Sequence, residues 1–237
     1  MSQETSNNLE PKLKQIVQTL KTFDDLTFGE YQFRRDALQK KVTSSERQRL
    51  IAEALQCGKD KAREIAHQFA GKTPSEITEA LGITVKEKLT DSVKGYILLA
   101  RYTDNSGTGE ITLMADALEK LDSREAHEAL GLKLETTKNI ILSHEIFHHL
   151  ESQDSNIFTQ TTTVNLWKIF GHQQKSHLRS LSEIAAMSFS WNLLQLTYSP
   201  QILEIVTAYQ TNQEFGLQLY DELVEIAGNV KIEQKSR

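Results

Sequence analysis

Apolar residues recur at intervals of three and four along most of the chain, which is the spacing of one face of an α-helix. The stripe is clear in the segment that begins near Glu46, where Leu50, Ile51 and Leu55 lead towards Phe69. Serine, threonine or proline precedes several of these stretches and glycine follows several, as expected for helix ends. The predicted helices cover about residues 11–21, 28–41, 46–69, 74–82, 117–130 (as one helix or more), 136–151, 164–170, 180–198, 201–211 and 214–227.

A shorter part of the chain has the pattern of β-strands. Residues 83–89 alternate between apolar and polar, and residues 96–102 are rich in tyrosine and large apolar side chains. A cluster of Asp, Asn, Ser and Gly at 104–109 predicts a turn, and about 110–114 reads as the returning strand. The chain is therefore predicted to be a mostly helical α+β protein with a small antiparallel sheet.

Composition narrows the class of protein. The 237 residues carry a net charge of −5, which argues against a general nucleic-acid binder. A single cysteine, Cys57, excludes an intramolecular disulfide and a cysteine-based zinc site. Residues 1–11 lack the apolar stretch of a secretory signal, and no apolar run approaches membrane-spanning length. We expect a cytoplasmic protein that binds neither a membrane nor nucleic acid directly.

The clearest chemical signal is a His-Glu-x-x-His motif that begins at His144. On a helix, His144 and His148 point the same way because residues four apart share a face. Two neutral imidazoles at this spacing can hold one Zn²⁺, and Glu145 can act as general base on the zinc-bound water. Ile140 and Phe147 lie on the same side, so without a metal the helix would bury unsatisfied polar groups.

A catalytic zinc usually has three protein ligands, and the motif supplies two of them. Glu151 lies about one turn past His148, but three ligands on one straight helix do not easily surround a tetrahedral ion. Glu183 is the favoured third ligand, because a second helix with small alanines can approach closely and present a carboxylate from another direction. The remaining candidates lie downstream of the motif and are Asp154, His172 and His177.

The order of acidic, small and apolar residues in segment 183–194 resembles the downstream helix of ImmA/IrrE-type metallopeptidases, although Ser190 stands where alanine is usual. The histidine motif matches the zinc motif of that family, and residues 73–85 are similar to an upstream element, with Thr78 at an alanine position. The resemblance covers about residues 59–194 and shows no helix-turn-helix module. The downstream matches are Glu183, Ala186, Phe189, Leu193 and Leu194.

The resemblance implies a zincin-like metallopeptidase domain with a gluzincin-like site. His144, His148 and Glu183 would bind zinc and Glu145 would act as base. Members of the family are typically intracellular peptidases of protein substrates, in some cases of a repressor. The alternative function is a non-catalytic regulatory or protein-binding module that retains a zincin-like fold. A third interpretation is a structural protein in which the motif is a coincidence.

The expected organisation is a polar tail and helical extension at 1–45, a zincin-like metallopeptidase domain at 46–199 and a helical extension at 200–237. A homodimer through the terminal helices is compatible with this organisation, but nothing in the sequence demands one. The strand at about 110–114 is predicted to hold an extended peptide along its exposed edge. Candidate donors to the oxyanion of the tetrahedral intermediate are Tyr102, His172, His177, Arg179 and Tyr198.

Overall fold

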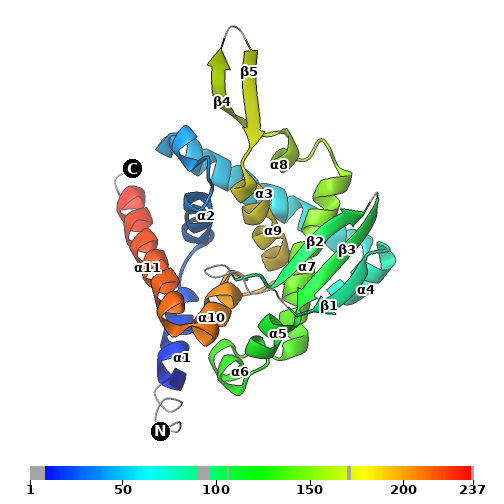
Figure 1. The fold of residues 1–237 in the computed structure, drawn as a ribbon, viewed down its shortest axis with the longest axis vertical. Helices are drawn as coiled ribbons and strands as arrows, with labels where there is room; N and C mark the ends of the chain where they lie inside the picture. The colour runs from blue at the N-terminus through cyan, green and yellow to red at the C-terminus, as the bar shows by residue number, and fades with distance from the viewer. Residues whose placement is uncertain (1–8, 90–96, 106, 170–171, 236–237) are drawn as a thin grey trace.

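The helix that carries the His-Glu-x-x-His motif, α7 (Leu134–Gln153), packs against a small sheet and against α9 (Arg179–Leu193) (Figure 1). Its apolar stripe is buried as the sequence pattern predicts, with Ile140, Ile146 and Phe147 almost fully removed from solvent. The burial of this stripe fixes which side of α7 faces α9.

The computed structural model describes residues 9–89, 97–105, 107–169 and 172–235. Over these residues the chain is mostly helical with two small sheets, which confirms the predicted α+β class. No helix within these ranges is both long enough and apolar enough to cross a membrane. The elements besides α7 and α9 are α1 (Leu9–Leu20), α2 (Asp25–Arg34), η1 (Gln39–Lys41), α3 (Ser44–Gln68), α4 (Pro74–Ala80), β1 (Thr84–Lys88), β2 (Ala100–Asn105), β3 (Thr108–Met114), α5 (Ala115–Leu121), α6 (Arg124–Leu130), α8 (Phe158–Thr161), β4 (Thr163–Ile169), β5 (His172–His177), α10 (Ile202–Thr211) and α11 (Gln213–Lys235).

The three-stranded sheet is mixed, so the prediction of an antiparallel sheet is wrong for one of its strands. β3 lies in the middle, with β2 antiparallel on one side and β1 parallel on the other. The predicted hairpin is confirmed, and its ladder runs from Ala100 opposite Leu113 to Asn105 opposite Thr108. Alternation reveals that β1 is a strand but carries no information about its partner or direction. Tyr96, the first residue of the predicted strand, lies outside the described residues.

The central position of β3 overturns the prediction that residues 110–114 offer an edge to a peptide. Both sides of β3 are paired, one with β1 and one with β2. Among the strands that the structure describes, β2 pairs only with β3, so its other edge is free. β2 also contacts α7, the helix that carries the motif.

The predicted helix at 164–170 is also wrong. The segment is strand β4, which pairs with β5 in an antiparallel hairpin that projects from the body of the molecule (Figure 1). Val164, Trp167 and Ile169 are β-branched or aromatic residues, and such side chains favour an extended backbone. The last residue of the predicted helix, Phe170, lies outside the described part of the chain.

His172 and His177, predicted to lie in a loop, are instead the first and last residues of β5. His172 pairs with Ile169 at the outer end of the hairpin, and His177 pairs with Thr163 at its base, next to α9. The two histidines are therefore held apart by the length of a strand.

The predicted helix at 28–41 is divided in two. α2 ends at Arg34, and η1 is a single short 3₁₀ turn. Between them the carboxylate of Asp36 accepts the amide of Leu38 over 2.8 Å, which stabilises a turn in place of a further helical turn. The chain therefore changes direction at Asp36.

α9 ends at Leu193 rather than near Tyr198. The chain reverses at Gln195, whose φ of 50° lies in the left-handed region. The amide of Leu196 donates to the carbonyl of Trp191 over 3.0 Å, as in a helix C-cap that usually contains glycine. A non-glycine residue in this role explains why the sequence pattern did not reveal the end of the helix.

α9 packs most closely against α3, and a glycine permits the approach. A Cβ atom on Gly58 of α3 would overlap the carbonyl oxygen of Ala185 and lie 2.8 Å from the amide nitrogen of Phe189. The terminal helices belong to the same hydrophobic core, to which α1 contributes Val17 and α11 contributes Leu223.

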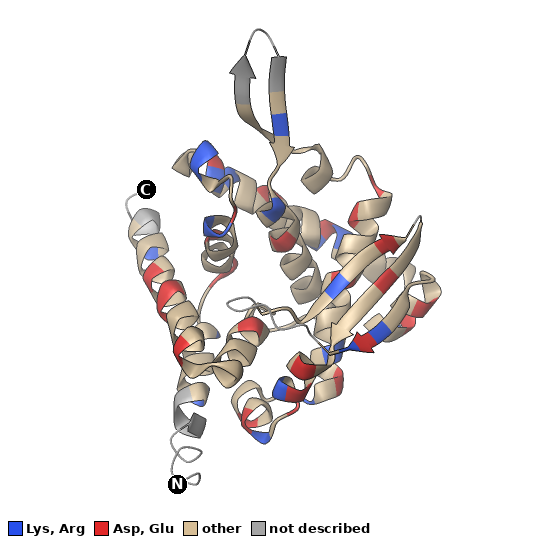
Figure 2. Ribbon diagram, in the orientation of Figure 1, with Lys and Arg blue, Asp and Glu red and all other residues tan. Residues whose placement is uncertain are grey.

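Charged residues cover the outside of this core. Lys and Arg are interspersed with Asp and Glu over most elements, and several acidic residues follow one another along α11 (Figure 2). Exposed ion pairs on this surface, such as Arg49 with Glu53, contribute little to stability. The fold is therefore stabilised mainly by its apolar core.

Gly58→Ala is expected to lower the free energy of unfolding by about 1–3 kcal/mol, because the added methyl group must push α9 away from α3. Gly228→Ala in α11 is the matched control, since its Cβ would meet no heavy atom within 4 Å. That change should be neutral or stabilise by up to about 1 kcal/mol, because alanine has the higher helix propensity. Urea denaturation of both variants measures the difference, and equal stabilities would contradict the close packing.

Candidate metal centre

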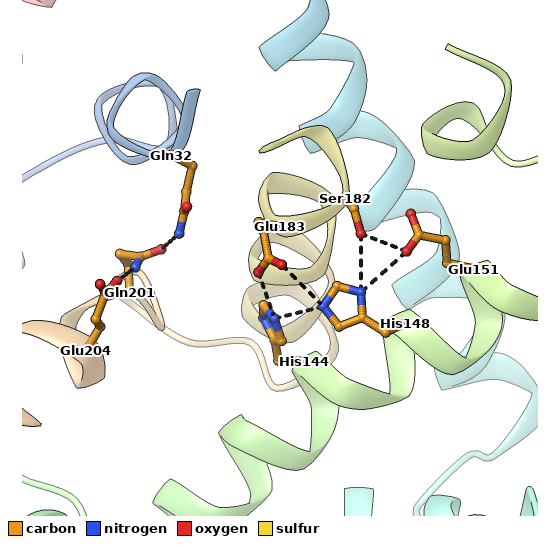
Figure 3. A network of polar contacts seen from close by, with 8 residues as sticks. All are labelled: Gln32, His144, His148, Glu151, Ser182, Glu183, Gln201 and Glu204. Atoms are coloured by element: carbon orange, nitrogen blue, oxygen red, sulfur yellow. Dashed lines mark hydrogen bonds and ion pairs between the residues drawn. The ribbon is translucent and has the colours of Figure 1, made fainter. Parts of the chain in front are cut away.

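Three side chains from two helices converge on one point. The Nε2 atoms of His144 and His148 lie 3.1 Å apart, one turn apart on α7. Glu183 enters from the first part of α9, with one carboxylate oxygen 3.3 Å from His144 Nε2 and the other 4.0 Å from His148 Nε2 (Figure 3). One ligand atom from each residue lies within 4.8 Å of the others, so this group could hold a metal ion.

The donor set fits a small divalent cation. Ligand atoms that surround a tetrahedral zinc at about 2.0–2.1 Å are separated from one another by roughly 3.3 Å. The 3.1 and 3.3 Å separations are close to that value, and the 4.0 Å separation exceeds it. Without an ion, two imidazole nitrogens and a carboxylate remain within this small space, where they must share protons.

The other ring nitrogen of His148 is held by two polar groups. Its Nδ1 atom lies 3.2 Å from the hydroxyl of Ser182 and 3.4 Å from a carboxylate oxygen of Glu151. Ser182 also donates to that carboxylate oxygen over 2.7 Å (Figure 3). Glu151, an alternative third ligand in the sequence analysis, thus lies on the side of the ring opposite Nε2. A carboxylate there fixes the tautomer and orientation of the imidazole.

Neighbouring charges shift the protonation of the cluster. Burial disfavours the charged form of His148, but the carboxylates of Glu151, Glu183 and Glu145 outweigh burial and raise the pKa of His148 to about 9. Burial likewise disfavours the charged form of Glu183, but His144, His148 and the more distant Arg179 lower the pKa of Glu183 to about 2. The two shifts therefore favour a protonated His148 beside an ionised Glu183, so that these side chains form an ion pair when no metal is bound.

A broad cleft gives access to the cluster. It has a volume of about 1250 Å³ and is lined by His144, Glu145, His148 and Glu183. Glu145 is buried, with 6% of its surface exposed, and stands next to His144 on the cleft side of α7. The predicted base thus shares the cleft with the three convergent side chains.

The candidate oxyanion donors occupy different places. Tyr102, His177 and Arg179 line the cleft, the last two as exposed residues around the start of α9. The hydroxyl of Tyr102 lies 3.0 Å from Nδ1 of His149, so it is already engaged with α7. Tyr198 is not among the residues that line the cleft, and its ring lies under the ammonium group of Lys21 at 4.4 Å.

Two other sequence candidates lie away from the three convergent side chains. The backbone of His172 is at the outer end of the β4–β5 hairpin (Figure 1). Asp154 forms an ion pair with Lys61 of α3 at 3.2 Å. The structure thus groups Glu183, and neither of these two residues, with the histidine pair.

A second wall of the cleft is formed by residues of α2 and of the segment around α10, and the sequence pattern did not predict it. Gln32 of α2 donates to the side-chain oxygen of Gln201 over 2.6 Å, and Gln201 donates to Glu204 of α10 (Figure 3). Arg35 adds an ion pair with Glu204 at 2.7 Å. Gln32, Arg35, Gln201 and Glu204 all line the cleft. Because these residues are far apart in sequence, no local pattern could have revealed the wall.

No family model matches the chain, and searches of the curated proteins and of the solved structures found no match either. Membership of the ImmA/IrrE type therefore stays a prediction from the motif residues. The geometry of the cluster and its cleft is the basis for an assignment of function.

Glu183→Ala is expected to abolish stoichiometric zinc binding, because two histidines alone remain. Glu151→Ala should retain zinc with roughly 10–100-fold weaker affinity, because it removes only a partner of His148 Nδ1. Zinc content and competition with a chromophoric chelator distinguish the two variants. Full zinc in Glu183→Ala would show that another side chain is the third ligand.

The pKa of His148 makes the stability of the chelator-treated protein depend on pH. A folded-state pKa of about 9, above the ordinary value of 6.5, stabilises the fold fully below pH 6.5 and loses this contribution as the pH rises through 9. We expect the free energy of unfolding to decrease by on the order of 1–3 kcal/mol between pH 6.5 and pH 9, as measured by urea denaturation. Glu183 adds nothing in this window, because its pKa is lowered and its contribution is lost only in acid. If the unfolding free energy of His148→Gln depended on pH in the same way, the dependence would not come from His148.

Proposed function

We propose that the chain is a zinc-dependent peptidase of the ImmA/IrrE type that hydrolyses peptide bonds of a protein substrate. The observation that supports the proposal most directly is the convergence of His144, His148 and Glu183 beside Glu145 in one open cleft. Two imidazoles and one carboxylate are a common ligand set of catalytic zinc. The four residues are those that the resemblance assigns to the site.

A bound zinc ion would polarise water and the scissile carbonyl. The chain supplies the proton transfers and the orientation of the ligands. In this proposal Glu145 takes a proton from the attacking water and passes it to the leaving amine. Ser182 and Glu151 hold the ring of His148, and Arg179 or His177 donates to the oxyanion from the edge of the cleft.

The shape of the cleft favours a peptide over a small molecule. Its volume of about 1250 Å³ exceeds the roughly 300–1000 Å³ of typical small-molecule pockets. Ala100 and Tyr102 of the free-edged strand β2 contribute to its lining. An extended chain that pairs with β2 would cross the cleft with its backbone hydrogen bonds satisfied. These features support a protein substrate held as an added strand.

Glu145→Gln is expected to bind one zinc with the affinity of the wild type and to lose cleavage by roughly 10²–10⁴-fold, because it removes the base and leaves the ligands. The assay is mass spectrometry of a peptide library after incubation with zinc-loaded protein. Cleavage at the normal rate by Glu145→Gln would refute the base assignment. Zinc binding without turnover in the wild type would support the alternative, a non-catalytic protein-binding module.

A further inference from the structure

The third side chain of the cluster depends on the placement of α9, and α9 lacks an N-cap side chain of its own. Leu178 occupies the cap position and forms no side-chain hydrogen bond, and the first turn contains no acidic residue. Uncapped amides at the start of a helix need an acceptor when they are buried. The first turn of α9 is only a few residues before Glu183, so the same turn fixes the ligand.

An acceptor for the first turn of α9 comes from Asp36, which lies far upstream in the sequence. Asp36, between α2 and η1, accepts the backbone amide of Ser180 over 2.9 Å with one carboxylate oxygen. Its other oxygen accepts the amide of Leu38. Asp36 is buried, with 8% of its surface exposed, so neither contact is readily replaced by water. A carboxylate at this end also interacts favourably with the helix dipole of α9.

The segment that carries Asp36 is itself fixed. The adjacent Arg35 pairs with Glu204 of α10 at 2.7 Å, and its guanidinium lies 4.2 Å from the centre of the Tyr31 ring. Both Asp36 and Ser180 line the cleft that holds the cluster. The acceptor is therefore a rigid part of the site and not an exposed side chain that can rotate away.

We propose that Asp36 is a positioning residue for the metal centre, which sets the first turn of α9 so that Glu183 meets His144 and His148. The inference rests on the metal binding contained in the proposed function, but not on peptide cleavage. It gives the N-terminal extension a definite role, because residues outside the motif region control whether the third ligand is in place.

The test compares the zinc affinity of the full chain and its variants by competition with a chromophoric chelator. Asp36→Ala leaves the amides of Ser180 and Leu38 without this acceptor, and we expect about tenfold or greater loss of affinity. Asp36→Asn keeps one acceptor oxygen, so its affinity should fall between those of the wild type and the alanine variant. The visible absorption of the cobalt-loaded variants reports whether the ligand geometry is altered.

Ser123→Ala is the matched control for a general loss of stability. Ser123 caps α6 by accepting the amide of Ala126 over 3.2 Å, and it does not line the cleft. This variant should be less stable yet bind zinc with the affinity of the wild type. Hydrogen exchange of the amides from Ser180 to Glu183 should accelerate in Asp36→Ala and stay unchanged in Ser123→Ala.

Three outcomes overturn the inference. Asp36→Ala with the zinc affinity of the wild type would do so, as would an equal loss of affinity in Ser123→Ala. A wild-type protein that binds no zinc would refute both this inference and the proposed function. A wild type that binds zinc but cleaves no peptide would refute only the peptidase, and the comparison of affinities would still decide the role of Asp36.

Discussion

The close approach of α9 to its neighbours is the constraint on which the candidate site depends. Glu183 reaches the histidine pair because α9 lies against α7 on one side and against α3 on another, where Gly58 leaves room for its backbone. Among the described residues, all three convergent side chains lie on helices that pack within the core. This arrangement agrees with the need of a metal centre for ligands held at fixed positions.

The two ring nitrogens of His148 face different groups. The side that faces Glu183 is directed towards the convergence point, and the opposite side is held by Ser182 and Glu151. Ser182 and Glu183 are neighbours on α9, so one short piece of helix provides both one of the three convergent side chains and a hydrogen-bond partner for His148 of α7. A shift of α9 would disturb both contacts together.

Local sequence patterns predicted the features that depend on local chemistry. The spacing of His144 and His148, and the start of α4 after Thr73, follow from residues within one or two helical turns. Glu183 could be proposed because small residues after it favour close helix packing. The strand character of β4 agrees with its own β-branched and aromatic residues and with its adjacent partner β5, and the helical prediction gave these local signals too little weight. The order of the sheet and the contact between Asp36 and Ser180 depend on distant partners. Propensity and periodicity carry no information about such partners, which is why these features were missed.

The wall formed by Gln32, Arg35, Gln201 and Glu204 has a consequence for the order of events during synthesis. Its contacts join residues separated by 169 positions, so the wall cannot form until the segment around residue 204 has left the ribosome. The histidine pair and Glu183 emerge earlier and can meet first. A nascent chain would thus expose the three convergent side chains before the residues that complete the second wall of the cleft.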